Sequence, residues 1–480
     1  MRRRDLMGLG LGLGLASSRL FCAPPVAWDL SCDVAVAGGG GAGLSAALSA
    51  AQNGASVMLF EKMPRIGGDT LISGGYFNAV DPARQKPQGI RDSEALFAAQ
   101  ILKAGAGGNT RIMAETFAHE SSVTLAWLEE LGMQFLPEVQ EIMGSGFPRA
   151  HKPLLPRGTG YVRTLSAAAK NHGVFIRTSM PVLRFVLDRE RNRVTGLVVM
   201  EKGRSVYVEA SRGVVAAFGG FGASRELRRL HAPETTELPA DSQAGATGEL
   251  LAEAAAAGAA IVNMAYVECV PGAGAAFDYP IRLDYIPSRM IIVNSKGRRF
   301  TNETAGRHEI ARAVLREMKE GPCFSIASSR ALEAFDPISL KNLYRGRFAG
   351  QAWKADAPEA LAVKMGLPPD AVAEEVKNAA VERSLDKPPF WGARLFLRVH
   401  NTLGGIRIDE HAHVLDRDGR PVAGFYAAGE ATGSVHGVER IGGNGVACAC
   451  TFGRIAGKNA VKNYTSIDLV SRGWQRRSSR

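Results

Sequence analysis

The pattern of apolar and polar residues predicts that the chain begins with a strand, a helix and a second strand. Residues 33–37 (DVAVA) form a short apolar run rich in valine, which is typical of a buried strand. An alanine-rich stretch follows and ends at Gly54, which predicts a helix, and residues 57–60 (VMLF) predict the next strand. This order favours a parallel sheet with a crossover helix, and therefore the α/β fold class.

The middle of the chain changes character twice. Short apolar runs between charged turns predict several strands from residue 174 to residue 222, and residues 248–264 (GELLAEAAAAGAAIVNM) predict a helix. Residues 265–394 are richer in prolines, aromatic residues and charges, so we expect a separate cap domain there. Within it, residues 355–384 predict helices that face solvent.

The glycines between the first two strands predict a dinucleotide site. Gly38 allows a tight turn, Gly40 lets a pyrophosphate approach the backbone, and Gly43 lets the helix pack closely on the strand. The free N–H groups at the start of the helix attract phosphate. Glu61, at the end of the second strand, is placed to accept hydrogen bonds from ribose hydroxyls.

Two further glycine-rich loops favour FAD over NAD as the cofactor. One follows Glu61 directly, at residues 63–75, and the other lies near the opposite end of the chain, where Gly442, Gly443 and Asn444 open a helix. The start of that helix would stabilise negative charge on a reduced flavin. The predicted FAD-binding residues are Gly38, Gly40, Gly43, Glu61, Lys62, Gly67, Gly68, Asp69, Thr70, Gly74, Gly75, Gly219, Gly429, Glu430, Gly443, Asn444 and Val446.

Composition narrows the function classes. Much of the formal net charge of +11 lies at the two ends of the chain, so a nucleic-acid surface is not indicated. No apolar run reaches the length of about 18 residues that a membrane span needs. The six cysteines form neither CxxC nor CxxCH, so we expect no metal site and no c-type haem. Cys448 and Cys450 lie in a small-residue helix and are expected to be core thiols.

The first residues, MRRRDLMGLGLGLGLASSRLFCAPP, predict export. A basic start precedes a short Gly/Leu segment, and the Arg3-Arg4-Asp5-Leu6-Met7 run resembles a twin-arginine signal. A disordered basic tail is the alternative. We therefore expect a bacterial periplasmic enzyme.

Taken together, these segments resemble the fumarate reductase and flavocytochrome c flavoprotein family, and within it the soluble exported branch. The matching motifs include VAGGGGAGLSAALSA, FEKMPRIGGDT, VNSKGRRFTNETAGRHEI, VHNTLGGIRID and YAAGEATGSVHGVERIGGNG, in the family's order. The resemblance implies a Rossmann-like two-dinucleotide-binding-domain FAD fold with an inserted capping domain. The expected divisions are an export signal at 1–30, FAD-binding parts at 31–264 and 395–465, the cap at 265–394 and a basic tail at 466–480.

The resemblance also implies catalytic roles. Arg307 would protonate one carbon of a C=C bond while flavin N5 delivers hydride to its neighbour, and His400 and Arg440 would hold the substrate carboxylate. An α,β-unsaturated acid needs such a set, because negative charge builds on its α-carbon and carboxylate. Electrons would come from a separate donor, a cytochrome or a quinone-linked protein.

Departures from the family pattern shape the expected chemistry. No histidine lies near residues 267–271, and the Thr-Glu pair of fumarate-specific members falls at about Arg282-Leu283. The expected substrate therefore has one carboxylate and is not fumarate. The relay acid behind Arg307 is expected at Asp284, with Glu309 as the second candidate.

The far end of the substrate site and the flavin loop also carry predictions. Tyr266, Tyr279 and Tyr285 are candidates to line that end, with core packing as the alternative for each. Asp69 and Thr70 stand where relatives carry a histidine that tethers the flavin, so we expect FAD to be bound without a covalent link.

Other readings of the same residues remain open. The enzyme could run in reverse, as a dehydrogenase or oxidase of a carboxylic or amino acid, or it could be a non-catalytic flavin electron carrier. Arg307 could be a solvated surface charge, and His400 could make a buried backbone contact. Arg440 could form a structural ion pair with Glu439 or Glu430.

Overall fold

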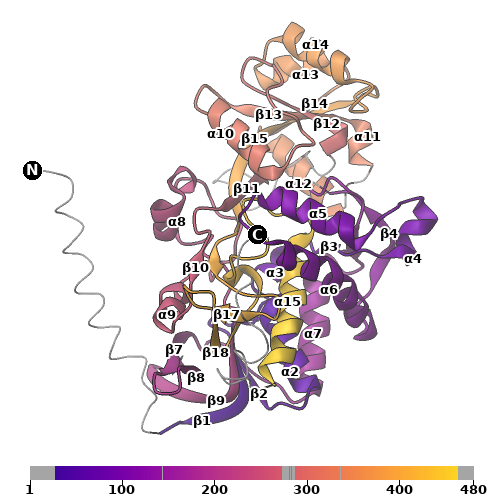
Figure 1. Cartoon of the computed structure of the whole chain (residues 1–480). Helices are drawn as coiled ribbons and strands as arrows, with labels where there is room; N and C mark the ends of the chain where they lie inside the picture. The colour runs from indigo at the N-terminus through magenta and orange to yellow at the C-terminus, as the bar shows by residue number, and fades with distance from the viewer. Residues whose placement is uncertain are drawn as a thin grey trace, which may run out of the picture.

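The computed structural model describes residues 27–142, 144–272, 281, 283, 287–333, 335 and 337–462. Two parts are visible in Figure 1: a body built on a mostly parallel sheet and, at one end of it, a cap drawn largely in orange. None of the helices within these ranges is both long and apolar enough to cross a membrane.

The body is organised around a parallel sheet, which confirms the predicted fold class. Its parallel strands run in the order β18-β9-β1-β2-β6, and three further strands extend the sheet by antiparallel pairing. The eight strands are β1 (Leu30–Ala37), β2 (Val57–Phe60), β6 (Phe175–Arg177), β7 (Val182–Asp188), β8 (Arg193–Glu201), β9 (Arg204–Ala216), β17 (His413–Leu415) and β18 (Pro421–Ala427).

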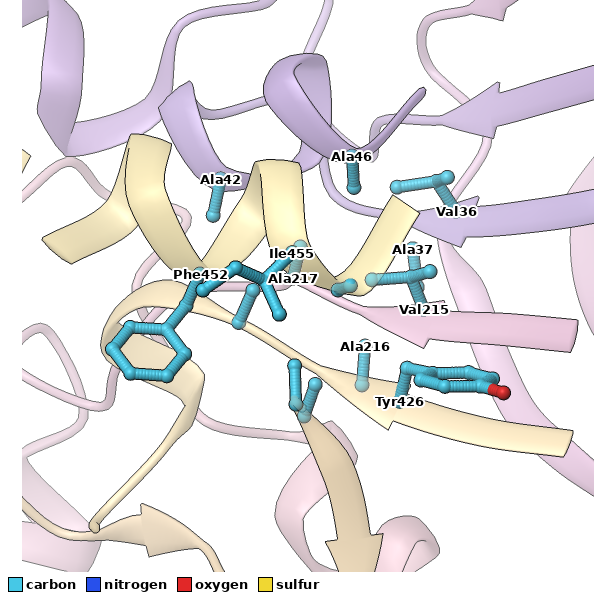
Figure 2. Close-up of a cluster of buried hydrophobic side chains, with 14 of the residues drawn as sticks. Val36, Ala37, Ala42, Ala46, Val215, Ala216, Ala217, Tyr426, Phe452 and Ile455 are labelled. Atoms are coloured by element: carbon cyan, nitrogen blue, oxygen red, sulfur yellow. The ribbon is translucent and has the colours of Figure 1, made fainter. Parts of the chain in front are cut away.

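Two helices from opposite ends of the chain pack tightly beside this sheet. They are α2 (Gly41–Gln52) and α15 (Asn444–Ala460). A Cβ added at Gly453 or Gly457 would lie 2.3 or 2.1 Å from a carbonyl oxygen of α2, so only glycine permits this approach. Figure 2 shows the small and apolar side chains that fill the space between these helices and the strands. The segments that contain α2 and α15, from opposite ends of the sequence, therefore belong to one domain.

Cys448 and Cys450 lie in this core, as predicted. Both are buried, and burial raises the pKa of each thiol to about 12. Neither is a thiolate near neutral pH.

The cap is built on a five-stranded antiparallel sheet in the order β11-β15-β13-β12, with β14 also paired to β15. Its strands are β11 (Val267–Gly272), β12 (Met290–Val293), β13 (Cys323–Ser328), β14 (Ala352–Ala355) and β15 (Phe390–Thr402). Its helices are α10 (Arg307–Glu317), α11 (Ser329–Leu332), α12 (Pro337–Phe348), α13 (Pro358–Met365) and α14 (Pro369–Ala379). Strand β15 runs through residue 394, where the predicted end of the cap falls, and carries its last residues back to the body.

The remaining elements complete the body and the join to the cap. A three-stranded sheet runs in the order β3-β5-β4, and β10 pairs with β16. These strands are β3 (Phe77–Asn78), β4 (Phe135–Gln140), β5 (Ala150–Pro153), β10 (Ile261–Val262) and β16 (Gly405–Ile406). The α-helices are α3 (Gly68–Ile72), α4 (Pro82–Gln85), α5 (Glu94–Gly105), α6 (Arg111–Glu130), α7 (Thr159–Asn171), α8 (Arg225–His231) and α9 (Leu250–Ala256). The short 3-10 turns are η1 (Lys86–Gln88), η2 (Pro233–Thr235), η3 (Pro287–Arg289) and η4 (Gly429–Ala431).

Two secondary-structure predictions need correction. The helix predicted over residues 248–264 is only α9, because Gly258, at φ +102°, turns the chain and the following apolar pair becomes β10. Residues 355–384 do form helices, α13 and α14, but these are not wholly solvent-facing. Leu361 and Val372 are fully buried in a core shared with β12 and β13, because each helix has one apolar face.

Candidate functional site

One continuous cavity of about 1490 Å³ joins the glycine loops of the body to the base of the cap. Most of the residues predicted from the sequence meet on its wall. They are Gly38, Gly40, Glu61, Lys62, Gly68, Asp69, Thr70, Gly74, Gly75, Gly219, Gly429, Glu430, Gly443 and Val446, together with Arg307, His400 and Arg440. Three predicted residues do not line the cavity but directly adjoin residues that do: Gly43, Gly67 and Asn444.

The three fingerprint glycines have different surroundings. Gly38 has φ +110°, and a Cβ there would lie 2.3 Å from the carbonyl oxygen of Ala217. A Cβ at Gly43 would lie 1.9 Å from the carbonyl oxygen of Gly38, so helix and strand need glycine at that crossing. At Gly40, which precedes α2 as its N-cap, the nearest atom to such a Cβ is 3.9 Å away. Gly40 therefore leaves open space at the helix N-terminus, as a bound phosphate requires.

Glu61 is held in one orientation at the end of β2. Its Oε2 accepts a hydrogen bond from Gly39 N at 2.7 Å, and its Oε1 accepts one from Met63 N at 2.8 Å. The carboxylate is buried and still lines the cavity, where it can accept from a ribose hydroxyl. Lys62 is fixed separately, because its Nζ donates to Thr247 Oγ1 at 3.0 Å and pairs with Glu249.

Buried polar contacts join the second glycine loop to α2 and the third glycine loop to β3. Gly41 N, in α2, donates to Thr70 Oγ1 at 3.1 Å. Asn78 Nδ2 donates to Gly442 O at 2.7 Å and to Asn444 Oδ1 at 2.8 Å. These hydrogen bonds fix the start of α15 beside the cavity, although Asn444 itself does not line the cavity. Asn78 is a supporting residue that was not predicted from the sequence.

Asp69 stands among acidic groups on the cavity wall. It accepts a hydrogen bond from Gln243 N. Burial, followed by the charges of Glu430 and Asp241, raises the pKa of Asp69 to about 8.

Together these features fit a flavin dinucleotide. Open backbone at a helix N-terminus, a fixed carboxylate and a second helix start are the groups that a pyrophosphate, a ribose and an anionic flavin need.

Arg307 is buried and is not a surface charge. It begins α10, and its side chain is 9% exposed. Helix α10 is anchored there because Glu439 Oε1 accepts a hydrogen bond from His308 N at 3.3 Å. A Cβ at Gly306 would lie 2.2 Å from the Glu439 carboxylate, so a larger residue before Arg307 would displace that side chain.

A single buried carboxylate joins Arg307 to Arg440. Glu268 Oε1 accepts from Arg307 Nη1 at 2.7 Å and from Arg440 Nη2 at 2.8 Å. The Glu268 side chain is 1% exposed, and it does not line the cavity. Burial raises the pKa of Glu268, but the charges of Arg440 and Arg307 outweigh burial and bring it to about 2, so Glu268 is ionised.

Arg440 is held from two adjacent strands. Its Nε donates to Asn401 Oδ1 at 2.9 Å, and Asn401 on β15 stands directly opposite Glu268 on β11. The ion pair considered from the sequence, with Glu439 or Glu430, is wrong: Arg440 pairs with Glu268. Glu430 instead accepts from Thr402 N and Oγ1 at 2.8 and 2.9 Å.

His400 makes a side-chain contact and not the backbone contact considered above. Its Nδ1 lies 3.1 Å from Asp241 Oδ2, and the ring lines the cavity. The nearby His436 also lines the cavity, and burial, followed by the charge of Arg440, lowers its pKa to about 3. His436 is therefore a neutral imidazole.

Several sequence candidates are not in this group. Asp284, Tyr279 and Tyr285 lie outside the described residues. Glu309 is exposed on the first turn of α10, whereas the buried Glu268 accepts a hydrogen bond from Arg307. Tyr266 does not line the cavity.

The supporting residues Glu268, Asn401 and Asp241 were not predicted. Asn401 directly follows His400 in the VHNTLGG motif, and this position in the motif was the only sequence feature that could have indicated its role. Glu268 lies in residues 267–271, where the family pattern points to a histidine and not to a carboxylate.

The comparisons with known proteins agree with this arrangement. A family described as the FAD binding domain matches residues 33–446. The fumarate reductase (cytochrome) of Shewanella frigidimarina is 30% identical over 442 residues, which cover 90% of this chain and 77% of that protein. The acrylate reductase flavoprotein subunit of Shewanella woodyi is 30% identical over 491 residues, covering 92% of this chain and 96% of that subunit.

A solved structure extends the similarity to the whole fold. The open conformation of a flavocytochrome c3 fumarate reductase has a TM-score of 0.73 at 28% identity, and the match covers 94% of this chain and 80% of that one. The predicted FAD fold and the predicted cofactor are thereby confirmed.

Proposed function

Because this chain belongs to the fumarate reductase and flavocytochrome c family of FAD-dependent oxidoreductases, which act on CH–CH bonds, we propose that it reduces an α,β-unsaturated acid with one carboxylate. One observation carries the proposal. Arg307 and Arg440 share one buried carboxylate and reach the cavity that the three glycine loops also line. The named reductases of fumarate and acrylate among the relatives support the substrate class.

The chain's own residues would bind the acid and supply the proton. Arg440 and His400 would hold the carboxylate, which draws negative charge from the α-carbon as the double bond is reduced. FAD, when bound, supplies the hydride. Arg307 would donate a proton to the α-carbon, and although arginine is a weak acid in water, a carbanion next to a carboxylate is a far stronger base. Burial of Arg307 keeps water away from that transfer.

Two further proposals concern the setting of the enzyme. The similarity to an acrylate reductase flavoprotein subunit supports a separate electron donor, a cytochrome or a quinone-linked protein. The RRDLM run supports export to the periplasm, and recovery of the protein in the cytoplasmic fraction of its own cells would contradict this.

We expect FAD to be released when the protein is unfolded. Asp69 accepts a hydrogen bond from Gln243 N, Thr70 accepts one from Gly41 N, and neither is the histidine through which membrane-complex relatives tether flavin. Acid precipitation of the loaded protein should leave the yellow colour in the supernatant. Flavin fluorescence that stays with the polypeptide in a denaturing gel would contradict non-covalent binding.

The direct test of function is anaerobic reoxidation. The flavoprotein, reduced with dithionite or methyl viologen, would be mixed with acrylate, methacrylate, cinnamate, urocanate, itaconate and fumarate. We expect a monocarboxylate to reoxidise it fastest and fumarate to be slow. If no unsaturated acid reoxidises it while oxygen or a quinone does, the proposal fails and the dehydrogenase or oxidase reading replaces it.

A further inference from the structure

Glu268 is placed to control the charge of the site without touching a substrate. It lies behind Arg307 and Arg440, which reach the cavity, while its own side chain is 1% exposed. One of its oxygens accepts from both guanidinium groups, and within the described residues the other oxygen, Oε2, has no hydrogen-bond partner. A buried carboxylate in this state depends on the two arginines for its compensation.

The position of Glu268 is set by the cap sheet. Strand β11 pairs with β15 so that Glu268 faces Asn401, and the register shifts directly after Glu268, between it and Cys269. Such an irregularity re-aims a side chain within a sheet. Asn401 and Glu268 together hold two nitrogens of Arg440, and the third, Nη1, donates to Ile441 O at 3.4 Å. The side chain fixed in this way lines the cavity.

The charged groups around the two arginines limit how much negative charge the site accepts. Arg307 and Arg440 carry two positive charges, and Glu268 is in contact with both. The carboxyl of Glu439 lies at the start of α10, and burial, followed by the charge of Glu268, raises its pKa. The next arginine on the wall, Arg398, has Asp241 beside it, with Nε 4.0 Å from Oδ1. Lys152, Arg345 and Glu141 also line the cavity, on other elements. Each substrate carboxylate at the two arginines meets the opposing field of Glu268, and a dicarboxylate meets it twice.

We propose that Glu268 is a specificity-determining residue, which makes the Arg307–Arg440 site select acids with one carboxylate over dicarboxylates. This inference rests on the proposed function in that the site binds the acid to be reduced. It adds the residue that sets the preference.

Acetate and malonate are a matched pair of probes. They differ by one carboxylate, and neither has two adjacent saturated carbons between which a double bond can form. Binding can therefore be followed in the oxidised, FAD-loaded enzyme, by calorimetry or by the change in flavin absorbance, with no turnover in either direction.

The natural enzyme should bind malonate no more tightly than acetate. In Glu268→Gln the amide keeps an oxygen for both arginines, and its NH₂ takes the place of the unpartnered Oε2. The malonate affinity, relative to that of acetate, should then rise by about tenfold or more. Glu268→Asp, which keeps the charge, and Glu320→Gln, which neutralises an exposed cap carboxylate, should keep the natural ratio.

Two results would overturn the proposal. One is an acetate-to-malonate ratio that is the same in the natural enzyme and in Glu268→Gln. The other needs no variant: malonate binding more than tenfold tighter than acetate to the natural enzyme. If the preference follows Glu268 but no unsaturated acid is reduced, the proposed function fails and this inference stands.

Discussion

Replacing Arg307 with alanine should lower kcat for the unsaturated acid by about 10²- to 10⁴-fold, the range that a positioned proton donor contributes. Binding of acetate should change far less, because Arg440 and His400 remain on the cavity wall to hold a carboxylate. The expected signature is thus a loss in the chemical step with the flavin still bound. Single-turnover reoxidation of the reduced enzyme measures that step directly.

The structure explains why position matters more than acidity for Arg307. Arg307 is the first residue of α10, and the start of this helix is fixed by the hydrogen bond from His308 N to Glu439. The guanidinium group of Arg307 is held by Glu268. A lysine at this position would reach the same carboxylate as a compact point charge, without the planar fork. We therefore expect Arg307→Lys to recover little of the lost rate.

The control for this prediction lies on the same helix. Arg312 is exposed on α10, and Arg312→Ala should leave the rate of flavin reoxidation unchanged. If Arg307→Ala turned over at the natural rate, Arg307 would not be the proton donor, and the mechanism proposed here would be wrong.

The parts of the molecule that could be predicted from sequence are those set by neighbours in the chain. The glycines of the first loop were readable because they follow a short motif of fixed spacing, and Gly43 serves a close approach within a few residues, to the carbonyl of Gly38. Arg307, His400 and Arg440 were readable because each sits in a motif of fixed spacing. The structure brings all three to one cavity.

What could not be predicted depends on pairing between distant strands. Glu268 is 39 residues from Arg307 and 172 from Arg440 in sequence. Its partnership follows from the register of β11 on β15, which periodicity does not determine. The prediction that the helices at residues 355–384 face solvent was wrong for a related reason. Their charges were visible in the sequence, but the sheet that covers their apolar faces comes from β12 and β13.

Replacing Arg440 with glutamine should have two separable effects, one on binding and one on stability. The substrate carboxylate loses its main cation, so KM for the acid and the acetate dissociation constant should both rise by about tenfold to a hundredfold. Glu268 also loses one of its two charged partners while it stays buried, and breaking a buried pair in this way costs about 3–5 kcal/mol of folding free energy. The thermal midpoint should fall accordingly.

A double variant distinguishes the two effects. In Arg440→Gln combined with Glu268→Gln, the uncompensated buried charge is gone, so most of the lost stability should return. The acid affinity should return only in part, because neutralising Glu268 removes a repulsive charge but does not replace the cation of Arg440. Urea denaturation gives the stability, and titration of the oxidised flavin with acetate gives the affinity. If the double variant recovered both in full, Arg440 would be a structural partner of Glu268 alone, and the carboxylate would have to be held by His400 and Arg307.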